Sequence, residues 1–202
     1  TIHYIIIVIF IIFNLININL LLKDTYFCII DSLIMEENNI YRVLGVMSGT
    51  SLDGVDLALI EFKTRPWKYD LLETATLRYP ENWIKTLSNI HKKEIKKIVE
   101  IDTSYTLFLG KLIDDFINYN KIDNIDFVCS HGHTAIHRPD EGMTYQLGNL
   151  STINKYYNLK TICDFRKQDV ENGGQGAPLV PIGDKILFPE YSACLNFGGF
   201  AN

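Results

Sequence analysis

Three apolar segments open the regularly patterned part of the chain, at residues 41–47, 55–62 and 69–79. The second is apolar on both faces, which is typical of a strand in the middle of a sheet. The third alternates apolar and polar residues, as a half-buried strand does. Because the connections between them are short, we expect neighbouring strands to pair antiparallel. The pattern predicts a three-stranded antiparallel meander.

A helical pattern follows the meander. Pro80 and Glu81 stand where the first turn of a helix favours proline and acidic side chains. A longer helix is expected over residues 102–119, where apolar side chains recur every three or four positions. Further along, the pattern predicts strands at 126–130, 143–147, 159–163 and 192–197, and helices at 151–157 and 177–188. This order predicts an α/β fold with a mixed sheet.

Composition narrows the functions that this domain can have. Of the 202 residues, 47% are apolar and 21% are charged, which describes a chain that folds around a core. The net charge of −5 gives no basic face of the kind that nucleic-acid binding needs. The four cysteines form no C-x-x-C pair, and three of them lie in apolar, strand-like runs. We therefore expect free thiols in a reducing compartment.

Residues 1–34 stand apart from the patterned domain, which we place at 41–202. From Tyr4 to Leu22 the segment carries no charge and is long enough to cross a bilayer, although asparagines interrupt it. A secretory signal fits less well, because no basic residues precede the apolar run and no small-residue cleavage site follows it. The remaining interpretation is translated AT-rich upstream DNA ahead of a start at Met35. A membrane partner is expected only if the segment is real.

The most specific stretch is the loop GVMSGTSLDGVD at residues 45–56. Glycines and hydroxyls in a tight loop allow backbone N–H groups to approach phosphate oxygens. A Walker A loop is excluded because there is no lysine, and a dinucleotide fingerprint is excluded because the loop leads into a strand. A loop between antiparallel strands resembles instead the first phosphate loop of the actin, hexokinase and Hsp70 superfamily.

Two carboxylates in this loop, Asp53 and Asp56, fit a magnesium nucleotide, because Mg²⁺ keeps most of its waters and is held by one or two carboxylates. The alternative is a plain hairpin turn with Asp53-Gly54 as its turn dipeptide. A second strand followed by Gly198-Gly199 near the end of the chain favours the nucleotide, since it resembles a second phosphate loop.

Two further polar clusters lie between these loops. The first is Ser130, His131, Gly132, His133 and Thr134, at the end of a predicted strand. Alternate residues on a strand share a face, so Cys129, His131, His133 and His137 permit a zinc site, although no second ligand group completes a tetrahedral set. A hydrogen-bonding site for a polar substrate and ordinary structural histidines are the alternatives. The second cluster, at residues 164–178, is a glycine-rich polar loop after a strand, which is either a ligand site or a surface loop.

These stretches together resemble the anhydro-N-acetylmuramic acid kinase family. The matching words are GVMSGTSLDGVD at 45–56, SHGHT at 130–134, QLGN at 146–149, DFRKQD at 164–169, GGQGAPLVP at 173–181 and LNFGGFAN at 195–202. Their order and spacing both fit. The resemblance implies the N-terminal lobe of an actin/hexokinase-like, ribonuclease H-like sugar kinase, with the C-terminal lobe missing.

The resemblance also implies a reaction and its site. The family opens the 1,6-anhydro ring of anhydro-N-acetylmuramic acid with water and phosphorylates O6, giving N-acetylmuramate 6-phosphate in peptidoglycan recycling. ATP is expected at Gly49, Thr50, Ser51, Leu52, Asp53, Gly54, Val55, Asp56, Gly198, Gly199 and Asn202, with Mg²⁺ held through water by Asp53 and Asp56. The sugar is expected at Ser130, His131, Gly132, Asp164, Arg166 and Gln175.

The chain departs from the family pattern in two places. His133 stands where the family usually has glutamine. The family's general base, an aspartate in a D-x-G-P-G-N word, is expected beyond Asn202, so we expect the 202 residues alone to be inactive. The alternative function is a non-catalytic nucleotide-binding or interaction module of the same superfamily. The resemblance further implies a cytoplasmic homodimer.

Overall fold

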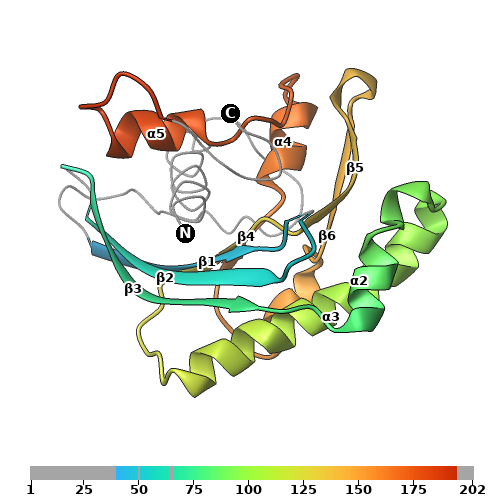
Figure 1. Cartoon of the computed structure of the whole chain (residues 1–202), viewed down its shortest axis with the longest axis horizontal. Helices are drawn as coiled ribbons and strands as arrows, with labels where there is room; N and C mark the ends of the chain where they lie inside the picture. The colour runs from blue at the N-terminus through green and yellow to red at the C-terminus, as the bar shows by residue number, and fades with distance from the viewer. Residues whose placement is uncertain (1–39, 50, 64–65, 195–202) are drawn as a thin grey trace.

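The computed structural model describes residues 40–49, 51–63 and 66–194, and its centre is a five-stranded mixed sheet (Figure 1). The strand order is β3-β2-β1-β4-β7. The strands are β1 (Ile40–Met47), β2 (Val55–Lys63), β3 (Lys68–Leu77), β4 (Phe127–Ser130) and β7 (Thr161–Ile162). β1, β2 and β3 pair antiparallel, whereas β4 and β7 run parallel to β1. The predicted meander and the mixed α/β sheet are both confirmed.

Helices cover both faces of this sheet. The long helix α3 (Ile95–Tyr119) lies on one face with α2 (Glu81–Leu87) near it, and α4 (Phe165–Glu171) and α5 (Pro181–Leu187) lie on the other (Figure 1). A separate hairpin joins β5 (His133–Arg138) to β6 (Met143–Leu147). Three short 3₁₀ helices complete the described chain: η2 (Ile90–Lys92), η3 (Pro139–Glu141) and η4 (Ser151–Lys155).

The sheet separates two apolar cores. Leu44 and Val46 of β1 pack on the α3 side, whereas Val43 packs on the side of α4 and α5. Successive side chains of a strand point to opposite faces, so a central strand covered on both faces needs apolar residues throughout. Each fully buried large aliphatic side chain contributes about 1.5–3 kcal/mol relative to an exposed one. This explains why β1 and β2 are almost continuously apolar.

Some elements differ from the sequence prediction. α3 begins at Ile95 rather than at residue 102, because the lysine-rich first turns show a weak helical pattern and Ile98 is buried only by tertiary packing. β5 and α4 are new elements, since their polar residues hide the periodicity. Residues 151–155 form a 3₁₀ helix, and β7 is shorter than predicted. Residues 192–194 are irregular, and the rest of that predicted strand lies outside the described residues.

The apolar segment at residues 1–34 lies outside the described part of the chain. In the ranges that the structure does describe, none of the helices combines the length and hydrophobicity needed to cross a bilayer. Cys129, Cys163 and Cys194 form no disulfide among the described residues, in agreement with the sequence.

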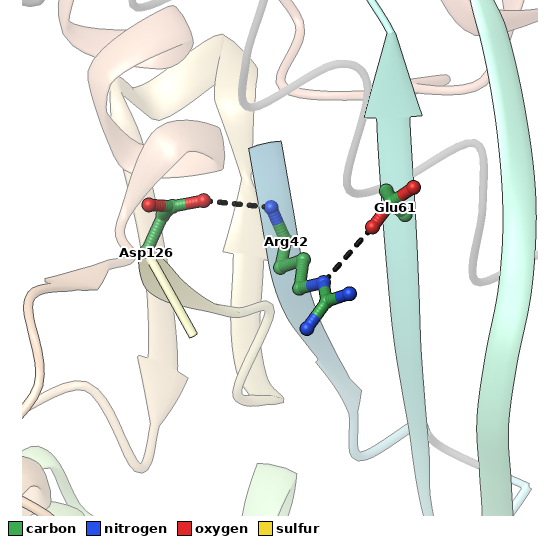
Figure 2. A network of polar contacts seen from close by, with 3 residues as sticks. All are labelled: Arg42, Glu61 and Asp126. Atoms are coloured by element: carbon green, nitrogen blue, oxygen red, sulfur yellow. Dashed lines mark hydrogen bonds and ion pairs between the residues drawn. The ribbon is translucent and has the colours of Figure 1, made fainter. Parts of the chain in front are cut away.

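A polar network ties three segments together where β1 begins, at the end of the strand opposite to the β1–β2 loop. Figure 2 shows Arg42 between Glu61 on β2 and Asp126, which precedes β4. The backbone N–H of Arg42 donates to Asp126 Oδ2 at 2.7 Å, and its Nε donates to Glu61 Oε2 at 2.9 Å. Arg42 and Glu61 are directly opposite in the β1–β2 register, so the pair stabilises the alignment of these strands.

Helix α3 packs closely against η4 at Gly110, and a substitution there tests how close this contact is. A Cβ at this buried position would collide with the carbonyl oxygen of Ile153. We expect Gly110→Ala to lower the free energy of unfolding by about 1–3 kcal/mol, because the clash outweighs the higher helix propensity of alanine. Chemical denaturation measures this, with the exposed Asn118→Ala on the same helix as control. A variant as stable as the parent would show that the two elements are not packed this closely.

Candidate functional site

The carboxyl ends of β1, β4 and β7 lie at one edge of the sheet, because these strands run parallel. In open α/β sheets ligands bind in the crevice outside this edge. The β1–β2 loop, the turn from β4 to β5 and the loop from β7 to α4 all start there. Figure 1 shows α4 and the β5–β6 hairpin beside the same edge. The fold therefore brings together the three polar stretches that the sequence singled out.

The β1–β2 loop carries two carboxylates with different surroundings. Ser51 Oγ donates to Asp53 Oδ1 at 2.5 Å, and both side chains are exposed. Asp56 is half-buried on β2 and accepts a hydrogen bond from the hydroxyl of Thr76 on β3. Gly49, at the start of the loop, is half-buried. An exposed carboxylate beside a glycine-containing loop could hold a hydrated Mg²⁺, which proteins bind through one or two carboxylates.

The shape of this loop is set by its backbone. Gly54 is buried, and a Cβ there would lie 2.6 Å from the carbonyl oxygen of Leu77, so β3 approaches too closely for any side chain. Leu52 is in the left-handed region, with φ of 62°. Val55 is buried as the first residue of β2. Thr50, Gly198, Gly199 and Asn202, also predicted for ATP, lie outside the described residues.

His131 is held as a neutral imidazole by its two partners. Its Nδ1 lies 2.7 Å from the Gly132 carbonyl oxygen, which accepts only, and Arg166 Nη2 donates to its Nε2 at 2.8 Å. The ring proton is therefore on Nδ1. Burial, with a contribution from the charge of Arg166, lowers the pKa of His131 to about 4. Arg166 also donates to the Gly176 carbonyl at 2.6 Å, so one guanidinium joins two predicted sugar-binding stretches.

Asn149 joins the end of β6 to the start of α4. Its Nδ2 donates to Asp164 Oδ1 at 2.8 Å, and burial raises the pKa of that carboxyl. Asp164 has a φ of 59°, a left-handed conformation that aspartate tolerates better than most residues. Asn149 lies in the QLGN word, but the sequence did not identify it as a site residue.

The glycine-rich loop after α4 is folded back onto the helix. Asp169 Oδ2 accepts a hydrogen bond from the Gly176 backbone N–H at 2.7 Å, and a Cβ at Gly174 would collide with the same carboxylate. Gly176 is buried, whereas the neighbouring Gln175 is exposed. The loop thus fixes the position from which the Gln175 side chain extends.

A buried carboxylate on α3 anchors the segment after β6. Asp102 is only 1% exposed, and its Oδ1 accepts hydrogen bonds from the Thr106 hydroxyl at 3.0 Å and the Gly148 N–H at 2.7 Å. Its Oδ2 accepts from the Tyr145 hydroxyl at 2.7 Å. The sequence did not identify Asp102 as a site residue, although an acidic residue four positions after Ile98, on the apolar face of the helix, was a signal for it.

Several buried polar atoms around this edge have no hydrogen-bond partner among the described residues. They are Ser130 Oγ, His133 Nδ1, Gln146 Oε1, Asn149 Oδ1 and Arg166 Nε. An unsatisfied buried donor or acceptor costs about 1–3 kcal/mol, and native proteins contain few of them. Five such atoms, from β4, β5, β6, the segment after β6 and α4, indicate a site built to bind something polar.

The zinc interpretation of the histidines does not agree with the geometry. Gly132 has a φ of 72° and interrupts the strand between them. As a result, the His131 ring lies 5.8 Å from that of Phe165 on one face of the sheet, and the His133 ring lies 6.2 Å from that of Tyr105 on the other. The expectation that both histidines share a face is wrong. In the described ranges, no group of three or more histidine, cysteine, aspartate or glutamate residues is arranged to hold a metal.

Comparison of the sequence with known proteins identifies the family to which the chain belongs. The chain matches the family described as anhydro-N-acetylmuramic acid kinase over residues 41–202. The curated relative from Shewanella amazonensis is 36% identical over 169 residues, covering 79% of this chain and 45% of that protein. The relative from Zymomonas mobilis subsp. mobilis is 38% identical over 176 residues, covering 79% and 48%. Both carry the name anhydro-N-acetylmuramic acid kinase. The chain thus spans about half the length of the curated relatives it matches.

The neutral state of His131 predicts a pH dependence. Its pKa is about 4 in the folded chain against an ordinary 6.5, so the unfolded chain binds the proton more tightly. The free energy of unfolding should therefore fall as the pH drops from about 6.5 to about 4. Urea denaturation at several pH values should show a shallower fall for His131→Asn. The exposed His91→Asn serves as control. An unchanged slope in His131→Asn would contradict the assignment.

Proposed function

Because the chain belongs to the anhydro-N-acetylmuramic acid kinase family, we propose that residues 41–202 form the N-terminal lobe of a sugar kinase that binds ATP and an amino sugar. The family is part of the actin/hexokinase-like superfamily, and the mixed sheet agrees with such a lobe. One observation carries the proposal: a glycine-containing loop with two carboxylates and a group of unpartnered buried polar atoms meet at one edge of the sheet.

The β1–β2 loop has the groups that a magnesium nucleotide needs. Asp53 is exposed at the loop. Asp56 lies at the start of β2, where one of its carboxylate oxygens accepts a hydrogen bond from the Thr76 hydroxyl. One or two carboxylates are the protein's usual share of a Mg²⁺ coordination sphere. Gly49 and Gly54 allow the backbone to approach the phosphates closely. Bound MgATP would supply the phosphoryl group, and Asp53 and Asp56 would hold its metal through water.

The sugar is proposed to bind on the other side of Gly132. Arg166 and the ring of His131 form one continuous hydrogen-bonded unit, and Ser130 and Asp164 lie on the strand end and loop beside it. Ser130 Oγ and Arg166 Nε have no partner in the described chain and offer hydrogen bonds to hydroxyl, ether or carboxylate oxygens. Gln175 extends from the exposed loop that Asp169 and Arg166 hold in place.

The proposed reaction has two parts. A water molecule loses a proton and adds to C1 of the anhydro sugar while the C1–O6 bond breaks. O6 receives the terminal phosphoryl group of ATP, giving N-acetylmuramate 6-phosphate and ADP. Deprotonation of the water needs a general base. None of the described residues is assigned that role; an aspartate beyond Asn202 is proposed, on the family resemblance. The chain's own residues position the two substrates, which by itself lowers the barrier.

The nucleotide part is tested at Asp53. We expect Asp53→Asn to weaken MgATP binding about tenfold and to leave metal-free ATP binding unchanged, because the carboxylate acts through the cation. NMR titration of the 202-residue chain detects binding even at millimolar affinity. Asp70→Asn, an exposed aspartate on β3 paired with Glu61 at the opposite end of the sheet, is the control. Equal MgATP affinity in both variants would remove Asp53 from the site.

The sugar part is tested by binding and by product mass. Anhydro-N-acetylmuramic acid should shift the NMR signals of the turn at Ser130 and of Arg166, and N-acetylglucosamine should shift them less. In an assay with ATP of a protein that also carries the proposed general base, the product should gain the mass of one water and one phosphoryl group, whereas simple phosphorylation adds no water. Absence of both saturable sugar binding and the hydrated product would overturn the proposed substrate.

A further inference from the structure

Asp164 occupies the N-cap position of α4 but does not cap the helix. Its backbone is in the left-handed region, with φ of 59° and ψ of 16°, and its side chain makes no capping hydrogen bond. Aspartate at an N-cap usually accepts such a bond from the first turn. A left-handed backbone costs free energy for residues other than glycine, and strain of this kind collects at functional sites. The carboxylate is thus directed away from its own helix and toward the segment after β6.

The group that receives this carboxylate is the side-chain amide of Asn149. Its Nδ2 donates to Asp164 Oδ1 at 2.8 Å and lies 3.5 Å from the backbone carbonyl oxygen of His131. A carboxylate and a carbonyl only accept, so the Nδ2 side of the amide has to face them. The amide also lies directly against Gly132, where an added Cβ would be 2.9 Å from Asn149 Oδ1. Asn149 therefore joins the turn after β4 to the start of α4.

The backbone that carries Asn149 is fixed by the core around α3. The Gly148 N–H donates to Oδ1 of the buried Asp102 at 2.7 Å. Gly148 has a φ of 93°, and a Cβ there would lie 2.9 Å from Leu109 Cδ2, so the chain runs close to the helix. The Cys163 thiol donates to the Asn149 carbonyl oxygen, with a sulfur–oxygen distance of 3.7 Å. With its backbone held on both sides, Asn149 has a defined position from which to hold the carboxylate.

We propose that Asn149 is a positioning residue for the sugar, because it fixes Asp164 through Oδ1 and leaves Oδ2 to accept a hydrogen bond from the sugar. This inference rests on the sugar-binding role proposed above for Asp164. Among the described residues none donates to Asp164 Oδ2, and the side chain is only half-buried. Anhydro-N-acetylmuramic acid can donate from its 4-hydroxyl and its acetamido N–H, since the anhydro bridge and the lactyl ether occupy its other hydroxyl positions. A carboxylate that only accepts is suited to either of these groups.

The role requires that Asp164 is ionised. Burial raises the pKa of its carboxyl, and the hydrogen bond from Asn149 acts against that rise. The other ionisable groups that face it from neighbouring elements are Lys167 and Glu171 of α4, Asp102 of α3 and Tyr145 of β6. Lys167 favours the charged form but is exposed, so solvent and salt screen it, whereas the two carboxylates oppose the charged form. Without Asn149, Asp164 should therefore be harder to ionise.

The first experiment follows the carboxyl carbon of Asp164 by NMR as the pH is changed, in the ligand-free chain. Asn149→Leu keeps a similar volume and removes the donor, so the Asp164 midpoint should move to higher pH. Asn149→Ala, which cannot overpack the site, should move it in the same direction. Asn118→Leu, at an exposed position of α3, is the matched control and should leave the midpoint unchanged. Unchanged midpoints in both Asn149 variants would overturn the proposal.

The second experiment measures the affinity of the same proteins for anhydro-N-acetylmuramic acid across pH, with MgATP affinity as the reference. We expect Asn149→Leu to bind the sugar about tenfold more weakly, because the acceptor is no longer held. The pH below which sugar affinity falls should also be higher than in the parent, and MgATP affinity should be unchanged. A merely structural role would weaken both ligands and would leave the pH dependence as it is.

The outcomes separate this inference from the proposed function. If the parent chain does not bind the sugar, the proposed sugar site fails and the sugar part of this inference falls with it. The carboxyl titration then still decides whether Asn149 controls Asp164. If the parent binds the sugar and Asn149→Leu binds it equally well at every pH, only the positioning role is overturned.

Discussion

The parallel pairing of β1 with β4 is the constraint on which the site depends. It pairs Val46 with Ser130, which are far apart in the sequence, and so places the end of the β1–β2 hairpin next to the turn that follows β4. A parallel pair cannot be closed by a tight turn, so α2, α3 and their connections occupy the crossover between the strands. The loops that leave the two strands in the same direction then form one polar surface. The Arg42 network fixes the same register at the other end of β1 (Figure 2).

Buried polar groups hold the second layer of the site in place. Asp102 accepts three hydrogen bonds inside the α3 core and thereby secures the chain after β6. Asn149, in that segment, reaches Asp164 at the start of α4. Because an unpaired carboxylate at this depth would be costly, its donors have to stay where they are. A chain of hydrogen bonds thus runs from the long helix to the loop that precedes α4.

Gly132 divides the site into two halves. Its left-handed backbone sends His131 to Arg166 and His133 to Tyr105, on opposite faces of the sheet. A Cβ at this position would lie 2.5 Å from the Leu147 carbonyl oxygen, so only glycine allows the turn. Both histidines are buried and uncharged near neutral pH, whereas Asp53 remains exposed to solvent. In the proposed kinase the exposed Asp53 therefore faces the nucleotide and its cation, and the neutral His131 ring lies with Arg166 on the proposed sugar side.

The sequence by itself determined the meander, the mixed α/β sheet and the family, because apolar periodicity and short glycine-containing words are local properties. It also located the loops that meet at the sheet edge, although it did not show that the two histidines diverge. The sequence did not predict β5, α4 or the first turns of α3, since their polar residues become ordered only through contacts with distant segments. Asp102 and Asn149 acquire their roles from partners on other elements, such as Tyr145 and Asp164. Only the tertiary structure decided these points, because burial and hydrogen-bond partners depend on which segments the fold brings together.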